Sequence, residues 1–250
     1  MMEKGEKMKK RLATIMMAIL VLAGYWGYQQ IEEIPESGTS QKQKVQAVES
    51  TTYKELATLE YDGKNQVVQI NQNRPTFTKE ELATNQTPGQ TFSDLDALNR
   101  VGVANALLNK SLMPNTDREP LYVNPTGWRN KKITVNGKSD WLYNRSHLIG
   151  YQLTGENNNV KNLMTGTRSL NTPGMLEYEN QIANYMKETG HEVRYRVTPV
   201  FRGDELVARG VQLEAQSIQD QKIAFNVYIF NVQEGVLIHY EDGTSEMRNS

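Results

Sequence analysis

The 250-residue chain contains no cysteine. This absence excludes a disulfide framework, thiolate catalysis, a cysteine-type zinc site and a lipid-modified cysteine anchor. A metal ion would therefore need oxygen or imidazole ligands, and imidazole is scarce, because the chain has three histidines. An excess of one charge is also absent: the formal net charge is −1 and indicates no particular partner.

Charge is nevertheless unevenly distributed along the chain. The segment Leu121–Asn171 has a local balance of +5. Its basic residues are Arg129, Lys131, Lys132, Lys138, Arg145, Lys161 and Arg168. A solvated loop surface explains such a cluster without a function, and charge alone favours that interpretation. The functional alternative is an anion-binding surface, because polyanions respond to local rather than total charge.

Long apolar stretches are also scarce, and the notable one is near the N-terminus. A basic tail, residues 1–11, precedes an uncharged run of 17 residues, 12–28, and this order predicts that the rest of the chain is extracytoplasmic. Aromatic residues at the outer end of the run favour an uncleaved membrane anchor, whereas cleavage after Ala23 would secrete the protein. The polar residues 29–50 predict a linker, which leaves 51–250 for the folded domain.

Hydrophobic periodicity predicts an α+β domain. A capping box at Ser93 and apolar residues at helical spacing predict a helix over 94–109. A second helix is expected from Thr172 to a stop at Gly190. Four strand-like segments follow at 193–201, 205–218, 222–232 and 236–240, and their short connections predict an antiparallel meander.

Three side chains are candidates for chemistry. The imidazole of His147 titrates near neutral pH and suits a general base, although a lone histidine at a strand end is more often structural. Glu179 lies in the apolar stripe of the second expected helix, where a buried carboxylate needs a charge or a polar network. Asn171 precedes that helix and suits either a cap or an oxygen ligand for a hard cation. His191 and His239 have structural explanations.

The arrangement of these residues resembles a known family. The tetrapeptide Asn144-Arg145-Ser146-His147 corresponds to the motif D-R-G-H, the segment Asn162–Asn171 to N-x-x-x-x-x-x-x-x-N, and Glu179 to the glutamate of the helix that follows. This pattern resembles the DNA/RNA non-specific endonucleases of the ββα-metal (His-Me finger) class, in particular Gram-positive DNA-entry nucleases and streptococcal DNases. The resemblance runs from about Pro125 into the C-terminal strands. It implies a ββα-metal core with a central antiparallel sheet flanked by helices.

The resemblance also implies roles for the residues. His147 would be the general base, Asn171 the direct protein ligand of Mg²⁺, with Mn²⁺ as a substitute, and Glu179 would orient a metal-bound water. Arg145 and Arg168 would neutralise phosphate, and Arg129, Lys131 and Lys132 would extend the nucleic-acid track. The implied reaction is hydrolysis of DNA and RNA with little sequence specificity, leaving 5′-phosphate ends.

Two residues depart from the family motif. Asn144 replaces its aspartate and Ser146 its glycine. Because neither change touches the base or the implied metal ligand, activity is expected to persist with a higher Mg²⁺ requirement. A non-catalytic module for DNA binding or uptake is the main alternative, and the retained His147, Asn171 and Glu179 disfavour it. A surface adhesion protein would explain the anchor and linker but not the motif. An inhibitor or uptake machinery as partner is not specified by the residues.

Overall fold

The computed structural model describes residues 47–48, 52–135 and 137–248. The expected basic tail, apolar run and most of the linker lie outside these ranges. Ala47–Val48 form the short strand β1, just before the expected domain start at residue 51. Within the described ranges, no helix is long and apolar enough to cross a membrane.

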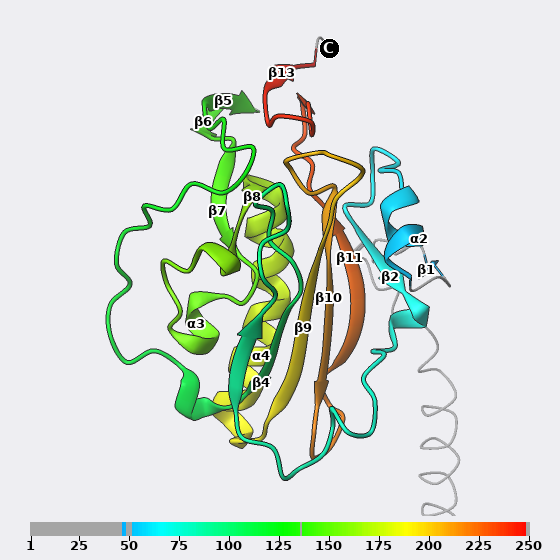
Figure 1. The fold of residues 1–250 in the computed structure, drawn as a ribbon, viewed down its shortest axis with the longest axis vertical. Coiled ribbons are helices and arrows are strands. Elements are labelled where there is room, and N and C mark those ends of the chain that lie inside the picture. The colour runs from blue at the N-terminus through cyan, green and yellow to red at the C-terminus, as the bar shows by residue number, and fades with distance from the viewer. Residues whose placement is uncertain (1–46, 49–51, 136, 249–250) are drawn as a thin grey trace, which may run out of the picture. The chain divides into compact units, whose positions relative to one another are not determined.

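The described residues form an α+β unit (Figure 1). The remaining strands are β2 (Val67–Ile70), β3 (Gly89–Phe92), β4 (Ala104–Leu108), β5 (Lys132–Val135), β6 (Lys138–Trp141), β7 (Tyr143–His147), β8 (Leu163–Thr167), β9 (Val193–Val200), β10 (Gly210–Ser217), β11 (Ala224–Phe230), β12 (Val236–Ile238) and β13 (Ser245–Met247). The α-helices are α2 (Tyr53–Thr58), α3 (Tyr151–Thr154) and α4 (Leu176–Thr189). Short 3₁₀ turns cover Asn71–Asn73, Lys110–Leu112 and Val160–Asn162, and a π-type turn covers Leu170–Met175.

The largest sheet among the described residues has the strand order β1-β2-β11-β10-β9-β4-β3. All its pairs are antiparallel except β1 with β2. Alternate residues of β9 point to opposite faces, so Val193, Tyr195 and Val197 are buried in the main core. Helix α4 packs its apolar stripe against that face (Figure 1). The three long strands β9, β10 and β11 confirm the first three strands of the predicted meander.

The helix expected over 94–109 is wrong. Asp96 accepts hydrogen bonds from the backbone N–H groups of Leu98 and Arg100, which closes a turn where a first helical turn was predicted. The chain then enters β4, which pairs with β3 and β9. Leu107 and Leu108 are both buried, because β4 is covered on its two faces. Of the apolar residues with helical spacing, Leu95, Leu98 and Val101 lie in the turn region before β4, and Leu108 alone lies in the strand.

A second, two-stranded antiparallel pair stands apart from the large sheet and carries the tetrapeptide. Strand β7 pairs with β8, and the chain passes from β8 through the turn Leu170–Met175 into α4. Helix α4 begins at Leu176 rather than Thr172, because Thr172 has non-helical angles, φ −143° and ψ 116°. Its end is as predicted: Gly190 adopts a left-handed φ of 72° and its N–H bonds to Met186.

Two hairpin pairs complete the described fold. Strands β5 and β6 form one, directly before β7. Strands β12 and β13 form the other, so β12 does not extend the meander as expected. Both pairs contribute to a small core of Ile133, Leu142, Tyr143, Val236 and Ile238.

Candidate functional site

A cavity of about 870 Å³ lies where β7, α3 and α4 meet. Its lining includes His147, Asn171 and Glu179, the three residues that the sequence marks for chemistry. Two residues of the tetrapeptide, Asn144 and Arg145, line it as well. Polar atoms dominate its surface, so a charged or hydrated ligand suits it better than an apolar one.

His147 ends strand β7 and is 6% exposed. Its Nε2 lies 2.8 Å from the carbonyl oxygen of Asn157. Because a carbonyl can only accept, the neutral ring carries its proton on Nε2 and keeps the lone pair on Nδ1. Burial lowers the pKa of His147 to about 4, and the nearby charge of Arg118 acts in the same direction. The ring is therefore neutral at physiological pH and able to accept a proton at Nδ1.

The end of β7 is held by Asn162, the first residue of the segment Asn162–Asn171. Asn162 is fully buried, and its side chain accepts from the N–H of Ile149 and donates to the carbonyl of the same residue. These two bonds have the pattern of a β-strand pairing, and they hold the backbone just after His147. Asn162 is thus a structural residue that positions His147.

Glu179 projects from the first turn of α4 and is 8% exposed. Burial raises the pKa of its carboxyl to about 7, although a Gln152 hydrogen bond and the Arg118 charge oppose the shift. Gly150 makes room for this carboxylate, since a Cβ there would lie 2.4 Å from Glu179 Oε2. Glu179 forms no ion pair with any described residue, so its buried charge lacks a direct counter-charge.

Asn171 lies in the turn Leu170–Met175, one turn before α4. Its Nδ2 donates to Thr172 Oγ1 at 3.2 Å, which leaves the carbonyl oxygen as its acceptor at the cavity. Met175 occupies the N-cap position of α4, so Asn171 is not the cap that the sequence allowed.

The donor set of the cavity fits a hard divalent cation. Among the described residues, no group of three or more His, Cys, Asp or Glu could hold a metal ion, which disfavours a site built from many protein ligands. The cavity lining instead offers one buried carboxylate, from Glu179, and the neutral amides of Asn171, Asn130, Asn144 and Gln152. A single carboxylate among neutral amides suits an ion that keeps most of its waters, as Mg²⁺ does.

The two motif departures are accommodated differently. Ser146 keeps the negative φ of an ordinary strand, so the family's glycine is not needed for the backbone. Its hydroxyl is fully buried against Gly166 and has no hydrogen-bond partner among the described residues. Asn144 faces the cavity, and its buried Nδ2 likewise lacks a partner in the described part of the chain.

Two arginines reach the cavity. Arg145 donates to the Val123 carbonyl and to Asn124 Oδ1, and its guanidinium stacks 4.6 Å from the ring centre of Trp128. Arg118 comes from the loop before β5, and its NH2 lies 3.3 Å from His147 Nδ1. Nothing in the sequence pointed to Arg118, because it lies in a loop without periodicity and 29 residues before its partner.

The other expected contact residues lie off the cavity lining. Arg168 is half exposed and pairs with Asp140 at 3.4 Å. Arg129, Lys131 and Lys132 are exposed on or beside the hairpin β5–β6. The remaining histidines lie off the cavity lining: His191 bonds to Tyr185, and His239 lies 3.5 Å from Glu246.

Comparisons with known proteins identify a family and similar folds. Residues 81–219 match the family model "DNA/RNA non-specific endonuclease". The structure of NucA from Streptococcus agalactiae with magnesium ion bound is 24% identical, covers 76% of this chain and 90% of that chain, and superimposes with a TM-score of 0.64. The Sda1 nuclease with bound zinc ion is 28% identical over 65% of this chain and 82% of that chain, with a TM-score of 0.58. A protein described as an extracellular endonuclease is 22% identical over 75% of this chain and 100% of that chain, with a TM-score of 0.54.

Proposed function

Because the chain belongs to the DNA/RNA non-specific endonuclease family, we propose that it is an extracytoplasmic, metal-dependent enzyme that hydrolyses phosphodiester bonds of DNA and RNA. The observation that carries the proposal is His147: a neutral imidazole with Nδ1 as its acceptor, in one cavity with Asn171 and Glu179. The basic segment before the N-terminal apolar run and the likeness to an extracellular endonuclease support the location. The nuclease domain is proposed to span 51–250.

A divalent cation is the proposed cofactor. The nuclease structures that resemble this chain hold magnesium in one case and zinc in another. Asn171 Oδ1 would bind the ion directly, and the Glu179 carboxylate would accept hydrogen bonds from its waters. When bound, the ion supplies charge stabilisation at a non-bridging phosphate oxygen and at the leaving 3′ oxygen.

His147 performs the proton transfer in the proposed reaction. Its Nδ1 takes a proton from the water that attacks phosphorus, the P–O3′ bond breaks, and the departing 3′ oxygen takes a proton from a solvent water. The products are a 3′-hydroxyl and a 5′-phosphate. The carbonyl of Asn157 fixes the ring orientation and stabilises the imidazolium that forms. Because the pKa of His147 is lowered to about 4, the base is ready at neutral pH without prior deprotonation.

The arginines are proposed to bind the phosphate. Arg118 contacts His147 Nδ1 in the free protein, where it occupies the lone pair that the reaction needs. An incoming phosphate is a stronger acceptor for a guanidinium than an imidazole is, so substrate binding draws Arg118 away and frees Nδ1. Arg145 is held by Val123 and Asn124 and presents its charge at the cavity wall. Backbone charge carries no sequence information, which accounts for the expected lack of base specificity.

The test is digestion of closed circular plasmid, linear DNA and RNA by the purified protein, with Mg²⁺, with Mn²⁺ and with EDTA. Cleavage of closed circles is expected with either metal and not with EDTA. The substitution His147→Ala should lower the rate by roughly 10²- to 10⁴-fold, the usual contribution of a general base. His191→Ala is the matched control, since His191 lies outside the cavity lining. Binding of DNA in a gel shift without any cleavage, unchanged by His147→Ala, would instead show a non-catalytic binding module.

A further inference from the structure

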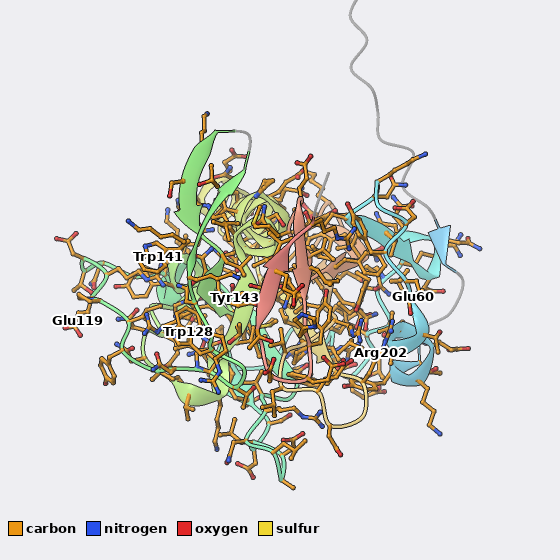
Figure 2. All side chains as sticks on the ribbon, turned by 90° about the horizontal axis from the view of Figure 1, so that it is seen from above. Glu60, Glu119, Trp128, Trp141, Tyr143 and Arg202 are labelled. Carbon is orange, nitrogen blue, oxygen red and sulfur yellow. The ribbon has the colours of Figure 1, made fainter. Side chains whose placement is uncertain are left out.

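Aromatic side chains form part of the cavity wall. Trp128, Trp141, Tyr143 and Tyr151 all line the cavity. Figure 2 shows the first three on the same side of the molecule. Tyr143 is 1% exposed and belongs to the small core, and Trp128 packs on it with 6.5 Å between ring centres. Trp141 differs, because it is 49% exposed and belongs to no core cluster among the described residues.

The hairpin that carries Trp141 does not need its ring for packing. In β5 and β6 the inward contacts come from Ile133, which is 6% exposed, and Leu142 follows Trp141 directly and is fully buried. Trp141 therefore exposes a large apolar ring to water at a polar cavity, which is unfavourable for the free protein. A half-exposed tryptophan beside a ligand site is typical of a residue that contacts the ligand.

Cations accompany the aromatic rings of the wall. Lys132 is the cross-strand partner of Trp141, and its Nζ lies 5.6 Å from the ring centre. Arg145 stacks on Trp128, and Arg118 lies 5.8 Å from the ring centre of Tyr151. A nucleic-acid strand presents a phosphate and a flat base at each step, so cations placed beside aromatic rings complement both.

We propose that Trp141 is a stacking platform for a nucleobase next to the cleaved phosphate, and that the protein therefore prefers strands with unpaired bases. This inference rests on the proposed nuclease function and names its substrate class. A base must leave its own stack to lie on Trp141, and it does so most readily in a single strand. Lys132 neutralises the neighbouring phosphate while the base lies on the ring.

The experiment compares kcat/KM of the full-length protein on a single strand, on the matching perfect duplex and on the duplex with a central mismatched bubble. Each substrate has one natural phosphodiester among phosphorothioate linkages, so the cleaved bond is known. The wild type should favour the single strand and the bubble over the duplex. Trp141→Ala should lower kcat/KM on the single strand by roughly five- to hundredfold, the effect of removing one stacked base. Its effect on the duplex should stay below about twofold, and Trp141→Phe should retain most of the preference.

Two further arms distinguish the outcomes. Abasic sites placed beside the cleavable bond should reduce the wild-type rate as Trp141→Ala does, and the variant should lose nothing more on that substrate. Leu237→Ala is the matched control, because Leu237 is a 42% exposed apolar residue off the cavity lining. If the wild type cleaves but Trp141→Ala lowers kcat/KM equally on all three substrates, or on none of them, the stacking role is wrong. If the wild type cleaves no substrate, the proposed nuclease function itself is wrong.

Discussion

At the scale of single residues, the cavity depends on groups held without their usual partners. Glu179 is a buried carboxylate with no ion-pair partner among the described residues, and Asn144 Nδ2 is buried without an acceptor there. Such groups cost stability, because the Gln152 hydrogen bond and the Arg118 charge offset the desolvation of Glu179 only in part, and Asn144 Nδ2 has no acceptor. A bound cation would compensate the charge of Glu179, and a bound phosphate would give Asn144 Nδ2 an acceptor.

The raised pKa of Glu179 makes stability depend on pH in the absence of divalent ions. The folded state holds this proton up to about pH 7, whereas an ordinary glutamate loses it near 4.5. The stabilisation that protonated Glu179 gives the folded state is therefore fully present below pH 4.5, and it is lost as the pH rises to about 7. The free energy of unfolding of the wild type, minus that of Glu179→Gln, should fall by on the order of 3 kcal/mol across this window.

Urea titrations in EDTA at several pH values would measure this difference. The lowered pKa of His147 has the opposite effect, because it makes the folded state more stable as the pH rises. This effect is the same in both proteins and cancels in the subtraction. A difference that stays constant between pH 4.5 and 8 would show that Glu179 is ionised throughout in the folded protein.

Asn144 should set the metal requirement. An aspartate at this position would place a negative charge at the cavity that Asn171 lines, and so would strengthen attraction for a cation. Asn144→Asp is expected to lower the Mg²⁺ concentration for half-maximal cleavage by roughly tenfold, the effect of about 1.4 kcal/mol. Ser146→Gly restores the other motif residue without adding charge and should leave the Mg²⁺ titration unchanged. Equal titrations for all three proteins would contradict the role given to Asn144.

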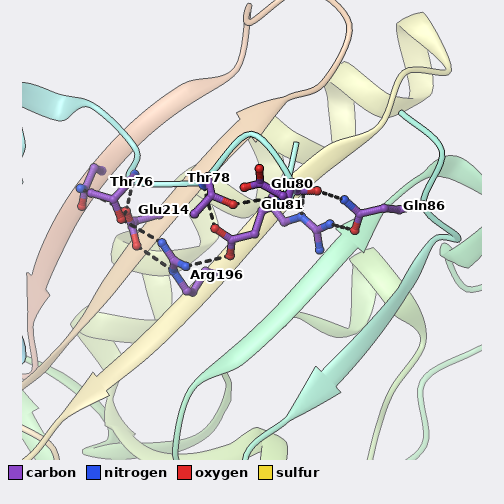
Figure 3. Close-up of polar contacts among 9 residues, drawn as sticks. Thr76, Thr78, Glu80, Glu81, Gln86, Arg196 and Glu214 are labelled. Carbon is purple, nitrogen blue, oxygen red and sulfur yellow. Dashed lines mark hydrogen bonds and ion pairs between the residues drawn. The ribbon is translucent and has the colours of Figure 1, made fainter. Parts of the chain in front are cut away.

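At the scale of elements, the face of the large sheet away from α4 is covered by the segment 74–86. Figure 3 shows the polar contacts that hold it. Arg196 on β9 donates to Glu214 on β10 at 2.9 Å, to Glu81 at 3.1 Å and to Thr76 at 2.9 Å. Thr76 in turn donates its N–H and hydroxyl to Glu214. The network satisfies a carboxylate whose side chain is 3% exposed, and it fixes the segment over β9 and β10.

Loss of Arg196 should therefore be costly. Arg196→Met leaves the Glu214 charge buried with only neutral partners, and we expect a loss of roughly 3 kcal/mol in the free energy of unfolding. Lys161→Met is the control, because its partner Asp94 has a side chain that is 93% exposed. An exposed pair contributes less than about 1 kcal/mol. Denaturant unfolding of both variants at pH 7 would measure the contrast, and equal losses would argue against a buried network.

At the scale of the whole molecule, charge segregation matters more than net charge. The segment Leu121–Asn171 carries +5 in a chain of net charge −1, and it supplies β5 to β8 and His147. A polyanion that approaches this segment meets local attraction, while the acidic remainder limits binding elsewhere. The affinity for nucleic acid should accordingly fall steeply with salt.

Two double variants would locate that salt dependence. DNA binding by the His147→Ala protein is measured as log Kd against log salt concentration. Adding Arg129→Gln and Lys132→Gln should reduce the slope by about 2, since each lost phosphate contact removes about 0.9. Lys54→Gln with Lys187→Gln removes the same charge at exposed positions outside the segment and should leave the slope unchanged. Equal slopes in both double variants would show that only net charge matters.

The residues proposed for the chemistry of the site can be identified from the sequence alone. His147, Asn171 and Glu179 lie within 33 residues of one another along a strand pair, a turn and a helix, so their spacing carries the motif locally. The sequence also predicts the end of α4 at Gly190 and the strands β9 to β11, because a left-handed cap and strand alternation are local signals.

The residues that surround these three become known from the folded structure. Residues 94–109 became a turn and β4 because β3 and β9 supply partners on both edges, which no local spacing records. Arg118 reaches His147 and Gly150 makes room for Glu179 through contacts between separate elements. Trp141 lies at the cavity because the hairpin β5–β6 leads directly into β7. Side chains that meet across loops leave no period in the sequence, and their contacts follow from packing alone.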